Sequence, residues 1–183
     1  MQETARPVDA TGPYRTAAQA VHSLLQLARK GGELSPDFWH DRFVLGFLFH
    51  FIHGIAVQAG AERGDYDEMP NVYRFLCGND GIEVLERSAA FRMNNDSDYR
   101  IGGDAAERFL DVIHRRRGHE NDADVIQARQ QAAEMVAGWD GPNRPEADNA
   151  FFACLLEAVF LNRVWHHVTS PGAAGPRQSK AER

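Results

Sequence analysis

Apolar residues recur along most of the chain at intervals of three and four, which is the spacing of amphipathic helices. Apolar and polar residues show no convincing alternation at period two, so no strand is expected. The pattern therefore predicts an all-α fold, a single-domain helical bundle of about seven helices around a very apolar central helix. The expected helices cover residues 14–30, 36–60, 70–77, 80–93, 104–117, 122–137 and 145–168.

Cap and turn residues set the expected boundaries of these helices. The clearest start is at Ser35, an expected N-cap that is followed by Pro36 in the first turn and by Asp37 near the positive end of the helix dipole. Residues 94–103 are rich in Asn and Asp and are expected to form a polar loop. The next helix is then expected to begin at Asp104.

The two ends of the chain differ in composition from its middle. Residues 1–13 are polar and contain two prolines and a glycine, and residues 170–183 read SPGAAGPRQSKAER. Neither stretch has enough apolar residues to offset the entropy lost on ordering. We expect a disordered arm over 1–13, a helical domain over 14–169 and a disordered tail over 170–183.

The most apolar stretch covers residues 43–57 and reads FVLGFLFHFIHGIAV. A helix that is apolar nearly all round is expected to be enclosed by other helices. A membrane span is the alternative, but it needs about 18–20 continuous apolar residues, and this run is shorter and holds two histidines. We therefore expect the stretch to pack inside the protein, with no membrane as a partner.

Charge argues against nucleic acid as a partner. The chain of 183 residues has a formal net charge of −6, which repels a polyphosphate at long range. The run Arg115-Arg116-Arg117 concentrates positive charge at the expected end of a helix, where it complements the helix dipole. Binding of a phosphate by this run is the alternative.

Cysteine usage and the first residues suggest a reducing compartment. Cys77 and Cys154 lie far apart, without the spacing of a zinc site or a disulfide framework, and are expected to be buried free thiols. The first residues lack the basic region and apolar run of a signal peptide. A cytoplasmic location is the default expectation.

Three histidines on apolar helices form a candidate ligand site. His50 and His53 share one strip of the expected central helix with Trp39, and His166 lies on a comparable strip of the last helix, with Arg163 at its margin. Neutral imidazoles in a bundle core could bind a metal, a haem or a polar small molecule. Alternatively, they serve only as hydrogen-bonded residues of the core.

The pair His40-Asp41 resembles the metal-binding dyad of the HD-domain phosphohydrolases, which are also helical. The resemblance implies a metal held by His40, Asp41 and an upstream histidine, for which His22 is the candidate, together with a distant acid. The sequence departs from the family in the short separation of His22 from His40. The residues RFVLGF after the dyad also differ from the family's usual small, glycine-containing continuation.

No complete catalytic constellation is evident in the sequence. The many large apolar residues, including 11 Phe and 3 Trp, favour a protein that acts by binding a protein partner or a small molecule, as a homodimer or other homo-oligomer. The alternative is a metal-dependent phosphohydrolase of HD-like type that uses His22, His40 and Asp41. The sequence leaves the cofactor and the substrate unknown.

Overall fold

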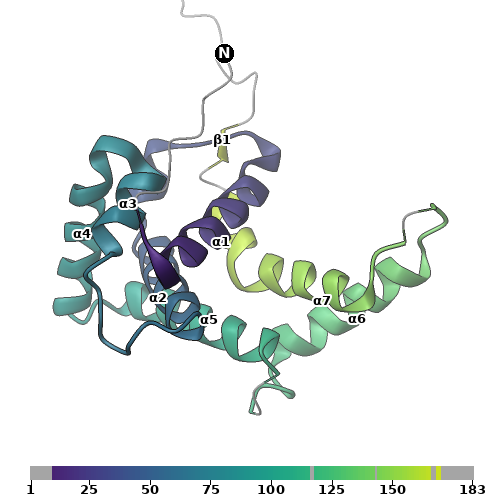
Figure 1. Cartoon of the computed structure of the whole chain (residues 1–183). Coiled ribbons are helices and arrows are strands. Elements are labelled where there is room, and N and C mark those ends of the chain that lie inside the picture. Colours follow the sequence, from purple (N-terminus) through teal and green to yellow (C-terminus); the bar gives the residue numbers. More distant parts are fainter. Residues whose placement is uncertain (1–9, 116–117, 143, 166–167, 170–183) are drawn as a thin grey trace, which may run out of the picture.

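The computed structural model describes residues 10–115, 118–142, 144–165 and 168–169, and 77% of the structure is helix and 1% strand, so the predicted all-α class is confirmed (Figure 1). The α-helices are α1 (Gly12–Ala28), α2 (Arg42–Gln58), α3 (Met69–Cys77), α4 (Gly81–Met93), α5 (Ser97–Ile113), α6 (Ala123–Ala137), α7 (Ala147–Leu156) and α8 (Asn162–Val164). Shorter elements are the 3₁₀ helices η1 (Arg29–Gly31), η2 (Pro36–His40) and η3 (Gly78–Asp80), the π-helix η4 (Glu157–Leu161), and the strands β1 (Glu33–Leu34) and β2 (Val168–Thr169).

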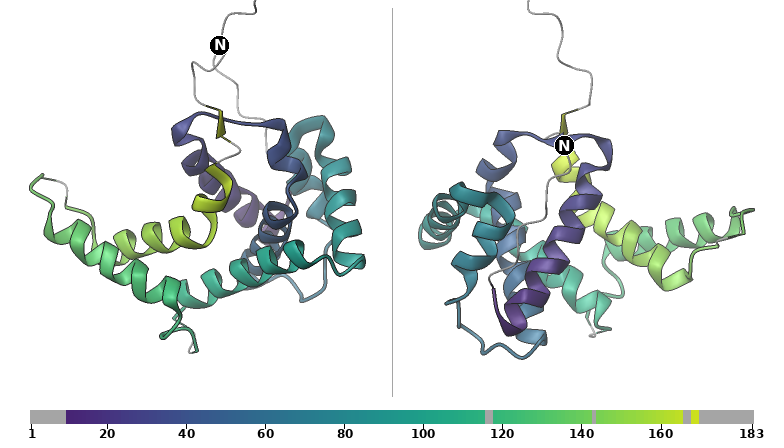
Figure 2. Two further views of the ribbon diagram at one scale, coloured as in Figure 1. Left: turned by 180° about the vertical axis from the view of Figure 1, so that it is seen from behind. Right: turned by 45° about the horizontal axis from the view of Figure 1, so that its top comes forward.

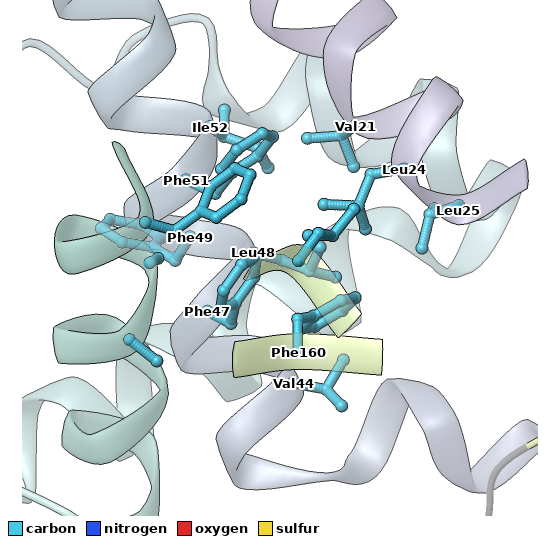
Figure 3. Close-up of a cluster of buried hydrophobic side chains, with 14 of the residues drawn as sticks. Val21, Leu24, Leu25, Val44, Phe47, Leu48, Phe49, Phe51, Ile52 and Phe160 are labelled. Carbon is cyan, nitrogen blue, oxygen red and sulfur yellow. The ribbon is translucent and has the colours of Figure 1, made fainter. Parts of the chain in front are cut away.

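Helix α2 carries the most apolar part of the sequence, and its side chains are buried against α5 and α1. Phe47, Leu48 and Ile52 are 0% exposed. Figure 3 shows side chains of α1 and α2 meeting Phe160 of η4 in one cluster. The rings of Phe47 and Phe160 are stacked with their centroids 4.2 Å apart. Apolar burial of this kind supplies the main driving force for folding.

Small residues bring the backbones of α2 and α5 close together. A Cβ atom added at Gly46 would lie 1.9 Å from the carbonyl oxygen of Tyr99, and one added at Gly102 would lie 2.1 Å from the carbonyl oxygen of Phe43. Only glycine leaves room for backbone atoms at such a distance. The two helices therefore pack backbone against backbone at these points.

The expected start of the second helix at Ser35 and Pro36 is wrong. Pro36 opens the 3₁₀ helix η2, whereas α2 begins six residues later with Asp41 as its N-cap. Asp41 has an extended backbone, and its carboxylate accepts a hydrogen bond of 2.9 Å from the backbone N–H of Val44. Ser35 and Asp41 are both residue types that commonly cap helices. Only Asp41 is placed to pair with an N–H of the first turn of α2 that has no partner within the helix.

The polar loop expected over residues 94–103 is also wrong for most of its length. Asn95 has a left-handed φ of 50°, and the chain then enters α5 with Asp96 as N-cap. The Asp96 carboxylate accepts hydrogen bonds from the backbone N–H groups of Asp98 and Tyr99. Gly102 belongs to the helix because it faces α2.

Helices α6 and α7 lie side by side as a hairpin that extends away from α1–α4, as the views in Figures 1 and 2 agree. Helix α7 continues through the π-helix η4 into α8, which ends at Val164 and not near Val168 as expected. Val168 instead pairs with Leu34 in a short antiparallel contact of β2 with β1. No strand was expected there.

The first helix begins at Gly12, two residues before the expected start. The expected N-terminal arm otherwise falls largely on residues 1–9, and the expected tail on 170–183, which lie outside the described residues. Within the described ranges, no helix combines the length and the apolar character that crossing a membrane requires.

Candidate functional site

A groove of about 720 Å³ lies between α6, α7 and the end of α5, and we call it the hairpin groove. Two other hollows, of about 360 and 100 Å³, are smaller. The hairpin groove is lined by Val112, Arg115, His119, Glu120, Val125, Arg129, Ala132, Ala133, Val136, Ala137, Arg144, Ala147, Asp148, Phe151 and Phe152.

The apolar wall of the hairpin groove follows from the residue sizes on its two helices. Helix α6 places Val125 and Ala132 toward α7, and Ala133 lies beside them with only a methyl group. Helix α7 contributes Phe151 and Phe152, which are half-buried with ring centroids 5.7 Å apart. Because alanine adds little bulk, the two helices leave a hollow that is walled by the aromatic rings.

Charged side chains surround this apolar wall. The Arg129 guanidinium lies over the Phe151 ring, 5.3 Å from its centroid, in cation–π geometry. One turn before Phe151, Asp148 accepts from Arg115 at 3.0 Å. Glu120 is fully exposed, and hydrogen bonds from its own backbone N–H and that of Gly118 hold its pKa below the usual range, with smaller contributions from His119 and Arg129.

His119 is held at the groove by two carboxylates. Its Nδ1 lies 2.9 Å from an oxygen of Asp122, and its Nε2 lies 3.6 Å from an oxygen of Asp111. Asp122 is the N-cap position of α6, and Asp111 belongs to α5. The histidine therefore links the end of α5 to the start of α6, beside the groove.

The two histidines of α2 contact different residues. His50 Nδ1 lies 2.9 Å from an Oε1 atom of Glu107 in α5. His53 Nδ1 lies 3.3 Å from the hydroxyl oxygen of Tyr14 in α1, and that hydroxyl donates its hydrogen to the backbone carbonyl of Asp65. Since a hydroxyl has one hydrogen, the Nδ1–H of His53 is the donor to Tyr14.

Burial lowers the pKa of His53, and the neighbouring His50 lowers it further. The His53 ring packs against Tyr66 with centroids 4.7 Å apart. These contacts hold helices α1 and α2 and the loop after α2 together. His53 is a partly buried residue that is hydrogen-bonded to Tyr14, and ligand binding by His53 stays a prediction.

The other residues of the expected ligand site lie elsewhere. Trp39 packs edge-on against Phe38 at 4.8 Å, and its carbonyl accepts from Arg87. Arg163 lies over the Phe43 ring at 5.1 Å and lines the hollow of about 360 Å³. His166 lies outside the described residues.

No protein-family model matches this chain, and no curated protein or solved structure gives a significant match.

His40 and Asp41 of the expected metal set line the hollow of about 360 Å³ together with Arg163, whereas His22 belongs to α1 and does not line it. His22 packs beside Phe75 of α3 at 5.6 Å, with its Nε2 3.3 Å from the amide nitrogen of Gln26. His40 and Asp41 stand at the start of α2, where Asp41 caps the helix. Across the described parts of the chain, no group of three or more His, Cys, Asp or Glu is placed to hold a metal. The HD-like alternative stays a prediction.

Sequence reasoning missed the hairpin groove, although two signals for it were present. Helix α6 combines alanines at 128, 132, 133 and 137 with an arginine at 129, and the segment 151–152 is Phe-Phe. Arg115, the first of the three consecutive arginines, lies beyond the end of α5 and pairs with Asp148. Arg116 and Arg117 lie outside the described residues.

Proposed function

We propose that this protein binds a small, largely apolar molecule in the hairpin groove. The observation that carries the proposal is the size of the groove together with its lining. Its volume of about 720 Å³ falls in the range typical of small-molecule sites, roughly 300–1,000 Å³. Such sites are mostly apolar with a few placed polar groups, as here.

The lining favours binding over covalent chemistry. Of the described residues that line the groove, none is Ser, Thr, Cys or Lys, which leaves His119, Glu120 and Asp148 as possible nucleophiles. Glu120 accepts a hydrogen bond from the backbone N–H of Gly118. His119 is engaged by Asp111 and Asp122, and Asp148 is paired with Arg115. A receptor or carrier for a small molecule fits this set of residues best.

Binding of the neutral fluorophore N-phenyl-1-naphthylamine tests the proposal, because its emission rises when it leaves water. Ala133 is exposed and lines the groove, so A133F should fill the hollow without disturbing the core. We expect A133F to weaken binding by at least about tenfold, about 1.4 kcal/mol. A123F, an equal substitution at an exposed position of α6 outside the groove, is the matched control and should bind as the wild type does.

Two results would contradict the proposal. One is the absence of fluorophore binding to the wild-type protein at micromolar concentrations. The other is equal binding by A133F and A123F, which would place the fluorophore outside the groove.

The expected homodimer also stays a prediction. Ile126, Met135 and Trp139 are large apolar side chains of the hairpin that are 51%, 45% and 45% exposed. Exposed apolar surface of this kind is often covered by a partner. Light scattering at micromolar concentration measures the mass directly, and a monomer mass would remove the dimer from the proposal.

A further inference from the structure

We infer that the ligand of the hairpin groove is an amphipathic oxyanion, with its apolar body against Phe151 and Phe152 and its carboxylate or phosphate head on Arg129. This inference rests on the proposed function and names the class of molecule.

Arg129 is held in the groove by an aromatic ring. Its guanidinium lies over Phe151, 5.3 Å from the ring centroid. This contact is an attraction between the positive charge and the ring, and the guanidinium carries five N–H donors in a planar fork. An oxyanion that approaches such a fork can accept two parallel hydrogen bonds.

The charges around the groove differ in sign from those of the whole chain. The chain has a formal net charge of −6, yet arginines outnumber carboxylates among the residues that line the groove. Asp148 already accepts a hydrogen bond from Arg115 at 3.0 Å, so these two charges offset each other. The positive excess at an apolar hollow is complementary to an anion with an apolar body and opposes a cation.

The apolar wall and the cation are adjacent, which fixes how such a molecule would lie. Phe151 contacts Arg129 through its ring face, and Phe152 follows it in the sequence with a ring centroid 5.7 Å away. A chain or ring system that covers these side chains places its head beside Arg129. A purely polar anion would leave the wall exposed to water, and a neutral apolar molecule would make no charged hydrogen bond with the Arg129 guanidinium.

Displacement of N-phenyl-1-naphthylamine by four amphiphiles of equal chain length tests the inference. Dodecanoate and dodecyl phosphate should displace the fluorophore from the wild type at concentrations about tenfold below those needed with dodecanol. Dodecyltrimethylammonium should be the weakest. Equal displacement by all four, or preference for the cation, would overturn the choice of an anion.

Two variants of Arg129 connect the preference to this residue. R129Q should lose the difference between dodecanoate and dodecanol while it still binds the neutral fluorophore, which shows that the groove is intact. R129K keeps the charge without the planar donors and should retain part of the difference. R63Q, at an exposed arginine of the loop before α3, is the control and should match the wild type. An unchanged preference in R129Q would overturn the role of Arg129.

The two levels of the proposal fail in different ways. If the wild type does not bind the neutral fluorophore, the groove is not a binding site and the proposed function is wrong. If it binds the fluorophore without discriminating between the amphiphiles, only the ligand class is wrong. Co-sedimentation with phosphatidylglycerol vesicles that is abolished in R129Q would overturn the assignment to a free small molecule.

Discussion

Gly46 of α2 faces the backbone carbonyl of Tyr99 in α5, and a Cβ atom at this position would lie 1.9 Å from the carbonyl oxygen. The Cβ atom is fixed directly to the backbone of α2 and the oxygen belongs to the backbone of α5, so neither can move without shifting a helix. We expect G46A to lower the free energy of unfolding by about 3 kcal/mol, at the upper end of the cost of overpacking.

Urea denaturation measures this change. Gln58 is exposed at the end of the same helix, and Q58A should stay within about 0.5 kcal/mol of the wild type. A G46A variant as stable as Q58A would show that α2 and α5 do not approach as closely as described.

The Phe47–Phe160 stack should contribute strongly to stability. Both side chains are 0% exposed, and their ring centroids lie 4.2 Å apart. F160A removes a buried ring and should cost about 3–5 kcal/mol, whereas F160L keeps much of the volume and should cost less. Thermal unfolding followed by circular dichroism orders the variants, and a small loss in F160A would contradict the burial of η4.

The Tyr99 hydroxyl should contribute to stability. It lies 3.1 Å from the buried Ser88 hydroxyl, so Y99F breaks this hydrogen bond and should cost about 1 kcal/mol. Urea denaturation measures the change, and a Y99F variant as stable as the wild type would contradict this hydrogen bond.

His53 should make stability depend on pH in a defined direction. Because folding lowers the pKa of His53 below its ordinary 6.5, the unfolded chain takes up a proton at a higher pH than the folded chain. The free energy of unfolding should therefore fall as the pH decreases from 6.5 through the lowered pKa. Well above 6.5 the imidazole is neutral in both states, and its titration no longer changes the stability.

Urea denaturation at about pH 7.5 and about pH 5 isolates this effect through H53Q, which has no imidazole to titrate. The loss of stability between the two pH values should be smaller in H53Q than in the wild type. An equal or larger loss in H53Q would show that His53 is not held neutral by the fold.

The sequence predicted the helical class because apolar spacing records which side of each helix is buried. The expected and observed helices agree best for α3, α4 and α6, whose bounds lie within one residue of the expected ones. The pattern failed between residues 94 and 103, where polar residues and two glycines were interpreted as a loop. Gly102 and Gly103 are helical because they admit α2, and this is a tertiary reason that local propensity does not contain.

The candidate site was harder to predict than the fold. Histidines attract attention because imidazole binds metals and protons, yet His50 and His53 are engaged by Glu107 and Tyr14. The hairpin groove depends on how α6 and α7 lie side by side, and nothing in the sequence pairs Arg129 with Phe151. Packing geometry creates such a hollow, and residue identity then sets its charge.

Helix α7 continues without a break into η4, so the hairpin groove and the buried core share one helical segment. The same helical rod carries Phe151 at one end and Phe160, inserted beside Phe47, at the other. A molecule bound against Phe151 would therefore also stabilise the position of Phe160. Binding in the groove should therefore raise the melting temperature of the whole protein in a single cooperative transition, and not only that of the hairpin of α6 and α7.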